Sequence, residues 1–228
     1  DLGSSSVKVA IVDSITGENI LSIHEPKREM SIISQHADWA EQNPDDWWDF
    51  VCTATRRALN ESNIRSSDIK AIGISYQMHG LVVVDKNKKS LRNSIIWCDS
   101  RAVNIGEKAF QDLTPKTCIN KLLNSPANFT ASKLKWIKDN EPEVFEKIYK
   151  FMLPGDYIAL KLSDKISTTS NGLSEGIFWD YESDTVASWL LDYFEFDTGL
   201  VPQIVENFTA QCYVSKKASD ETGLPEGI

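Results

Sequence analysis

The chain has 228 residues, of which 41% are hydrophobic and 25% charged, a composition ordinary for a soluble globular protein. Its formal charge of −9 weighs against nucleic-acid binding, which usually needs a basic face, and no apolar run reaches the roughly 18 residues of a membrane helix. The four cysteines lie far apart without CxxC spacing, which argues against a zinc site and favours the reducing environment of the cytosol.

The first sixty residues predict a hairpin followed by a helix. Residues 6–12 carry apolar side chains at every second position, and residues 19–24 return as a second strand after a turn at 13–17. Residues 25–38 are polar and irregular. Asn43 and Pro44 then mark a helix start, because Asn caps free amides and Pro suits the first helical position. One face of this helix would carry Trp48, Val51, Cys52, Thr55, Ala58 and Leu59.

The remaining residues predict a mixed α/β domain. Residues 69–75 form a short, nearly continuous apolar run, which is typical of a central buried strand. Residues 81–84 and 94–97 flank a polar turn and predict a second hairpin. From Arg101 onward the pattern is mainly helical. We expect helix stops at Pro115, Pro126, Pro142 and Pro154.

The opening residues, Asp1-Leu2-Gly3-Ser4-Ser5-Ser6, contain the parts of a phosphate site. Gly and Ser let backbone amides approach phosphate oxygens, and a carboxylate at a strand end can hold Mg²⁺ through water. A string this short is more often only a tight hairpin, so both alternatives stay open. The strand that such a turn would follow is missing, and we expect some of the chemistry to lie outside these 228 residues.

A second candidate site follows residues 69–75, at Gln77-Met78-His79-Gly80. Gln77 and His79 can donate and accept hydrogen bonds to sugar hydroxyls, while Met78 can lie against the C–H surface of a sugar. The structural alternative is a buried turn in which His79 bonds to backbone and Met78 fills the core.

Asp99 and Arg101, in the string Trp97-Cys-Asp-Ser-Arg101, could reach the same pocket. They could equally cap the following helix and pair with each other. Trp39 could form an aromatic wall of the pocket or simply cover a loop.

Taken together and in this order, six strings resemble the FGGY family of carbohydrate kinases, and the resemblance covers nearly the whole chain. The strings with Q-M-H-G and W-x-E-Q-x-P are most similar to the members that phosphorylate xylulose, and less similar to gluconate, ribulose and glycerol kinases. The six strings are DLGSSSVK (1–8), DWAEQNPDDWW (38–48), GISYQMHG (73–80), IIWCDSR (95–101), LPGDY (153–157) and SEGIFWD (174–180).

The resemblance implies an α/β lobe with the actin-like, ribonuclease-H-like fold, a mixed β-sheet flanked by helices. Residues 1–228 would be the N-terminal sugar-binding lobe, and the C-terminal nucleotide-binding lobe would not be present in this chain. The general base of the family is an Asp expected after Ile228, so residues 1–228 alone should be inactive. The chain departs from the family at Cys98 and at 167–170, which puts a role for the second segment in doubt.

The resemblance also implies roles for individual residues. Asp1 would be the metal-associated acidic residue needed for catalysis. Met78 and His79 would contact the sugar. The phosphate would lie beside Ser4, Ser5 and Lys8, and Gln77, Trp39, Asp99 and Arg101 would line or support the pocket.

The implied activity is phosphoryl transfer from ATP, with Mg²⁺, to a pentulose, giving D-xylulose 5-phosphate from D-xylulose. The partners would be the sugar and ATP, in the cytoplasm, with no nucleic acid or membrane and a homodimer by analogy. Two alternatives stay open: a kinase for gluconate, ribulose or glycerol, and a non-catalytic sugar sensor of the same fold. An actin-like or chaperone ATPase is disfavoured, because such proteins orient no small sugar through a Q-M-H-G loop.

Overall fold

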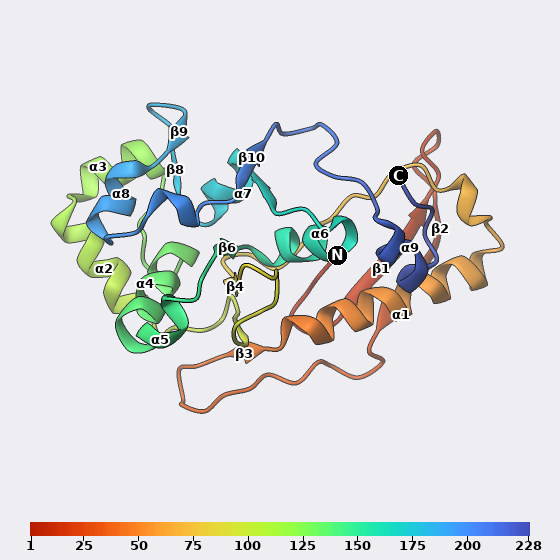
Figure 1. Cartoon of the computed structure of the whole chain (residues 1–228), viewed down its shortest axis with the longest axis horizontal. Helices are drawn as coiled ribbons and strands as arrows, with labels where there is room; N and C mark the ends of the chain where they lie inside the picture. The colour runs from red at the N-terminus through yellow and green to blue at the C-terminus, as the bar shows by residue number, and fades with distance from the viewer.

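The computed structural model, which describes all residues from 1 to 228, is elongated, with a hairpin and a long helix at one end and a group of short helices at the other (Figure 1). The strands form five two-stranded pairs rather than one wide sheet. Four pairs are antiparallel: β1 (Val7–Val12) with β2 (Asn19–Glu25), β3 (Glu41–Gln42) with β5 (Ser94–Ile95), β4 (Val82–Val84) with β6 (Lys150–Met152), and β8 (Trp179–Asp180) with β9 (Thr185–Val186). β10 (Gln203–Val205) runs parallel to β7 (Ser167–Thr169).

The helices lie along and between these pairs. α1 (Pro44–Ser62) packs against the β1–β2 hairpin, and α6 (Pro154–Ser163) lies near the middle of the molecule (Figure 1). The others are α2 (Val103–Asp112), α3 (Pro115–Leu122), α4 (Thr130–Asn140), α5 (Pro142–Phe145), α7 (Ser170–Glu175), α8 (Ser188–Tyr193), α9 (Lys216–Thr222) and the 3₁₀ turns η1 (Ser66–Asp68) and η2 (Thr198–Leu200). No helix has the length and apolar character needed to cross a membrane.

β4 separates the two main hydrophobic cores. Leu81 and Val83 belong to the core of the helical end, whereas Val82 and Val84 belong to the core under α1 and α6. Successive residues of a strand point to opposite faces. All four side chains are buried, so both faces of the strand are covered. The paired strand β6 divides in the same way, with Phe151 on one side and Met152 on the other. β4 is therefore the central strand of the fold.

The helix predicted after Asn43 is confirmed. The Asn43 side chain accepts a hydrogen bond from the Asp45 amide at 3.1 Å, and Pro44 is the first helical residue. Thr55 and Ala58 are buried as predicted, and Trp48 is anchored by its indole N–H, which donates to Glu221 at 2.7 Å. The predicted face omitted Trp47, which is fully buried and donates to Gln42 at 3.1 Å.

The central strand predicted at 69–75 is wrong. These residues pair with no strand, and Ala71, Ile72 and Gly73 are exposed. An apolar strand is buried on both faces only when other segments cover both of its faces. In this fold β4 is the strand that is covered in this way. Along this segment only Ser75 makes a strand-like contact, by accepting a hydrogen bond from the Leu2 amide at 2.8 Å.

The second hairpin and the helical tail are confirmed only in part. Leu81 and Ile95 form a bridge, but β4 and β5 take their main partners from β6 and β3, which lie far away in the sequence. The tail contains the predicted helices together with β6 to β10, which the sequence pattern missed because these strands are only two or three residues long. Pro115, Pro142 and Pro154 follow the predicted breaks and also begin the next helices.

Gly106 in α2 should not tolerate a side chain. A methyl group at this position would lie 2.1 Å from the Ala127 carbonyl oxygen, which is backbone and cannot rotate away. We expect Gly106→Ala to lower the free energy of unfolding by about 1–3 kcal/mol, although Ala is the better helix former. Urea unfolding of the intact protein measures this. Gly73→Ala is the matched control, since a methyl group there meets nothing within 4 Å. Equal stability of the two variants would contradict the packing of α2 on Ala127.

Candidate functional site

The first residues lie directly beside the loop that carries Met78 and His79. The Leu2 amide donates to Ser75 O at 2.8 Å, and the Gln77 amide donates to Leu2 O at 2.7 Å, which makes Leu2 and Tyr76 a parallel bridge. Leu2 is buried, so this pairing is shielded from water. The turn at Gly3–Ser6 and the Gln77–His79 loop therefore start from adjacent positions. Asp1, which precedes the turn, lines one cavity, whereas Met78 and His79 line another.

The Gly3–Ser6 turn is held by side chains from two other segments. The Gly3 amide donates to Ser6 O at 3.1 Å, which closes the turn. The Gln42 side chain donates to Ser4 O at 2.7 Å, and the Trp97 indole N–H donates to Ser4 Oγ at 3.1 Å. Ser5 is exposed. The turn thus leaves the Ser5 hydroxyl exposed, and this hydroxyl could donate to a bound anion that is partly open to solvent.

Asp1 carries one half-exposed carboxylate. Its Oδ2 lies 3.6 Å from Lys8 Nζ, and Ser75 Oγ donates to its Oδ1 at 3.4 Å. A single accessible carboxylate fits Mg²⁺, which keeps most of its waters and takes further oxygens from phosphate. No group of three or more His, Cys, Asp or Glu side chains in the chain could hold a metal ion by itself.

The Gln77–His79 loop is packed against the start of α6. A methyl group on Gly80 would lie 2.5 Å from Pro154, and one on Gly155 would lie 2.1 Å from the Tyr76 ring, so both close approaches require glycine. Met78 is exposed, which excludes the core-filling alternative for this side chain. Gln77 is buried, and neither polar atom of its side chain has a partner. A buried side-chain amide without a hydrogen-bond partner is costly. Both polar atoms of Gln77 are therefore available to bond to a ligand.

Asp99 and Arg101 lie inside the molecule and pair with each other. The Arg101 guanidinium donates to Asp99 Oδ2 at 2.6 Å and lies 2.7 Å from Glu41 Oε1. It lies 3.9 Å from the centroid of the Trp39 ring and 4.7 Å from that of Trp136, and the two rings pack edge-to-face against each other. The pairing alternative is thus confirmed, and direct contact with a sugar has no support, because the side chains of Asp99 and Arg101 expose at most 1% of their surface. Trp39 covers Arg101 in the same cluster.

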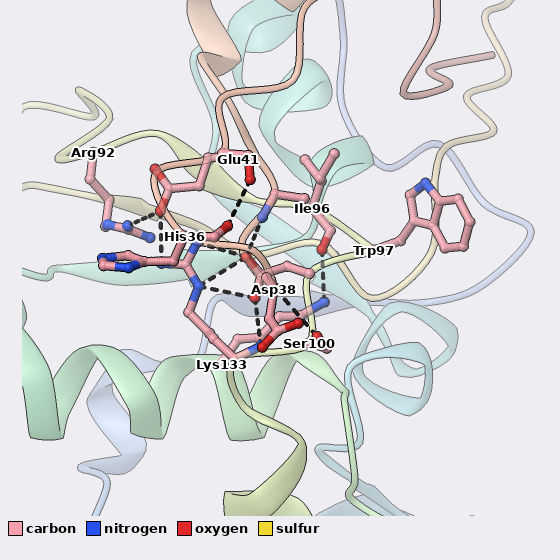
Figure 2. A network of polar contacts seen from close by, with 12 residues as sticks. His36, Asp38, Glu41, Arg92, Ile96, Trp97, Ser100 and Lys133 are labelled. Carbon is pink, nitrogen blue, oxygen red and sulfur yellow. Dashed lines mark hydrogen bonds and ion pairs between the residues drawn. The ribbon is translucent and has the colours of Figure 1, made fainter.

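Asp99 also joins two loops. Its Oδ2 accepts a hydrogen bond from the Ala40 amide at 2.6 Å, which ties residues 38–41 to residues 96–101. In Figure 2 the Trp97 ring points away from this network, and Lys133 reaches it from α4. The network therefore fixes the loop that presents Trp97 to Ser4, rather than lining the pocket.

Lys133 connects this loop with the Met78–His79 loop. Its ammonium donates to His79 O at 2.7 Å and to Ile96 O at 3.1 Å. Burial lowers the pKa of Lys133 to about 8, and the nearby Asp99 carboxylate partly offsets that effect. The side chain is a buried cation that holds two main-chain oxygens from separate loops.

His79 faces Glu175, at the end of α7. Its ring Nδ1 lies 2.8 Å from Glu175 Oε1, and the ring packs edge-on against Phe129, with centroids 4.1 Å apart. Both side chains are about one-quarter exposed, and they line one cavity together with Met78 and Asn171. The alternative of a buried turn in which His79 bonds only to backbone therefore describes only part of its environment. The ring also contacts the Glu175 side chain and reaches solvent.

A family model for the N-terminal domain of the FGGY family of carbohydrate kinases matches residues 1–228. The chain belongs to this family. The xylulose kinase of Bacillus subtilis is 30% identical over 99% of the chain, and that match covers 44% of the relative's length. The chain therefore spans less than half of this FGGY relative.

Solved structures of FGGY kinases share the fold. A xylulose kinase from Rhodospirillum rubrum superposes with a TM-score of 0.88 at 25% identity, and a gluconate kinase from Lactobacillus acidophilus with 0.84 at 22%. Each match covers 99% of this chain, and 46% and 44% of the respective structures. The predicted actin-like α/β fold is therefore confirmed. The fold alone does not distinguish a xylulose kinase from a gluconate kinase.

The sequence prediction omitted three residues of the candidate site. Trp97 begins the string that drew attention to Asp99, and Glu175 lies in the string 174–180, so both could have been found. Lys133 gives no local signal, because a Lys in an amphipathic helix usually faces solvent. Only the tertiary structure shows that it is buried.

Arg101 tests the buried ion pair. Replacing it by Met would leave the buried carboxylates of Asp99 and Glu41 without their cation. We expect Arg101→Met to lower the free energy of unfolding by about 3–5 kcal/mol, measured by urea unfolding. The matched control is Arg65→Met, which removes an exposed pair with Asp68 and should cost at most about 1 kcal/mol. A small effect at Arg101 would show that the loops are held by packing alone.

Asp156 gives a pH test. Burial raises the pKa of this carboxyl to about 6, and its Oδ2 has no hydrogen-bond partner. The folded state then binds more protons than the unfolded state between about pH 4 and 6, so stability falls as pH rises through this window, by roughly 3 kcal/mol. We expect Asp156→Asn to remove this fall, measured by urea unfolding across pH. Asp49→Asn, an exposed control, should keep it.

Proposed function

We propose that the protein transfers the terminal phosphoryl group of ATP, with Mg²⁺, to the terminal hydroxyl of D-xylulose, giving D-xylulose 5-phosphate. Family membership supports the kinase reaction, and the 30% identity to a xylulose kinase supports the pentulose. The observation that supports the proposal most directly is the pairing of Leu2 with Ser75 and Gln77, because it brings the Gly3–Ser6 turn, the proposed phosphate site, close to the Gln77–His79 loop, the proposed sugar site. In this proposal residues 1–228 are the sugar-binding lobe.

In this proposal each segment has a separate task. Asp1 binds Mg²⁺ through water, and the metal when bound neutralises charge on the ATP phosphates. The amides and hydroxyls of Ser4 and Ser5 bind the phosphoryl group, with Lys8 nearby as a cation.

The sugar would lie against the exposed Met78 side chain. His79 and the unpaired Gln77 amide supply hydrogen-bonding groups for its hydroxyls. Phosphoryl transfer needs positioning and charge neutralisation more than covalent help, which suits a site built from two rigidly paired segments. Asp99, Arg101 and Trp39 act behind this surface by holding the loops.

A substrate panel tests the proposal. The intact protein, as expressed from its own reading frame, is incubated with ATP, Mg²⁺ and D-xylulose, ribulose, gluconate or glycerol, and ADP formation is measured. We expect D-xylulose to give the highest kcat/KM. A higher kcat/KM for gluconate, ribulose or glycerol would overturn the substrate assignment. Binding of a sugar without ADP formation would instead favour a sensor.

Met78 tests where the sugar binds. Met78→Ala removes exposed apolar contact surface without opening a core cavity, so stability should stay within about 0.5 kcal/mol while KM for D-xylulose rises about tenfold. Ile15→Ala, on a hairpin turn and 94% exposed, is the matched control and should leave KM unchanged. An unchanged KM for Met78→Ala would place the sugar elsewhere.

A further inference from the structure

His79 uses three of its four polar atoms within the protein. Its amide donates to Glu175 Oε1 at 2.8 Å, its carbonyl oxygen accepts from Lys133 Nζ at 2.7 Å, and its ring Nδ1 lies 2.8 Å from the same Glu175 oxygen. The remaining atom, Nε2, has no hydrogen-bond partner in the chain, and the side chain is 24% exposed. Nε2 is therefore the atom that His79 can offer to a ligand.

The orientation of the ring is fixed from several sides. The His79 backbone has φ 58°, a left-handed conformation that is uncommon for a residue with a side chain. Hydrogen bonds at both its amide and its carbonyl hold this conformation, and Phe129 packs edge-on against the ring. A ring held in this way cannot exchange the positions of its two nitrogens without breaking the contact with Glu175.

Glu175 determines which nitrogen carries the proton. An ionised carboxylate can only accept, so a contact of 2.8 Å with Nδ1 requires a proton on Nδ1. The Glu175 backbone oxygen, 3.3 Å from Nδ1, is a second and more distant acceptor. Burial alone would raise the pKa of Glu175, but hydrogen bonds from His79 outweigh this effect and the pKa lies below its ordinary value. Glu175 is therefore ionised near neutral pH. In the neutral ring Nε2 is then left with a lone pair.

We propose that Glu175 is a positioning residue that holds His79 in its Nδ1-protonated tautomer, so that Nε2 accepts a hydrogen bond from a sugar hydroxyl. This role rests on the proposed function, in which the Met78–His79 loop binds the sugar. It assigns a task to a residue of the string 174–180 that lines the same cavity as Met78 and contacts His79 directly. It also explains why one Glu175 oxygen contacts both the amide and the ring of the same residue.

Imidazole ¹⁵N spectra of the intact protein test the tautomer. Residues 1–228 contain three histidines. His24 and His36 are exposed and serve as references, because a neutral imidazole in water carries its proton mainly on Nε2. We expect His79 to show a protonated Nδ1 and an unprotonated Nε2. In Glu175→Leu, which has a similar size but no side-chain acceptor, the Nε2-protonated tautomer of His79 should become more populated, because only the backbone oxygen of residue 175 then remains near Nδ1. His79→Asn assigns the signals by deleting one set.

A double-mutant cycle on KM tests whether Glu175 acts through His79. We expect Glu175→Leu to raise KM for D-xylulose about tenfold, the loss of one hydrogen bond, with little change in kcat. In a His79→Asn background, which tolerates the left-handed backbone but lacks Nε2, Glu175→Leu should have no further effect. Glu206→Leu, at an exposed position, is the matched control and should leave KM and the His79 signals unchanged.

The outcomes separate this role from the proposed function. An active wild type whose His79 tautomer is the same in Glu175→Leu overturns the role of Glu175 alone, and so does an additive effect in the His79→Asn background. A wild type that phosphorylates no sugar overturns the proposed function and, with it, the role in sugar binding. Because the spectra report on folded protein without ATP or sugar, a variant that loses activity by unfolding is recognised directly.

Discussion

β4 is buried on both faces, and the position of the candidate site depends on this constraint. Residues 81–84 alternate between two hydrophobic cores, so a slip of one residue would move every side chain into the other core and disrupt the packing of both. The Gln77–His79 loop enters β4 directly, and the bridge from Leu81 to Ile95 fixes the start of the 96–101 loop. Two loops of the site are therefore anchored to the most buried strand of the molecule.

Charged side chains then hold these loops from behind. Arg101 and Asp99 form a buried pair, and Lys133 donates to main-chain oxygens of both loops. Buried charges are costly unless they are paired and hydrogen-bonded, and each of these has partners from separate segments. Their benefit is geometric: the exposed side chains Trp97 and Met78 are presented from loops whose backbones are fixed on the inner side.

Local patterns predicted local structure well and long-range pairing badly. The β1–β2 hairpin and the start of α1 follow from alternation and from Asn43 and Pro44, which act within a few residues. The strand predicted at 69–75 failed because an apolar run records how much surface is buried and does not say which segment covers it. The same limit affected the site, where Asp99 and Arg101 were correctly identified as belonging together but their burial was not visible.

The sequence by itself determined the family, through six strings in a fixed order, and it identified the turn at 3–6 and the loop at 77–80 as candidate phosphate and sugar segments. The tertiary structure decided which of their side chains are available. It buried Asp99, Arg101 and Lys133, exposed Met78, and brought Glu175 to His79 across 96 positions of sequence. The physical reason is that burial and partnership depend on which distant segments meet, and no local pattern encodes those meetings.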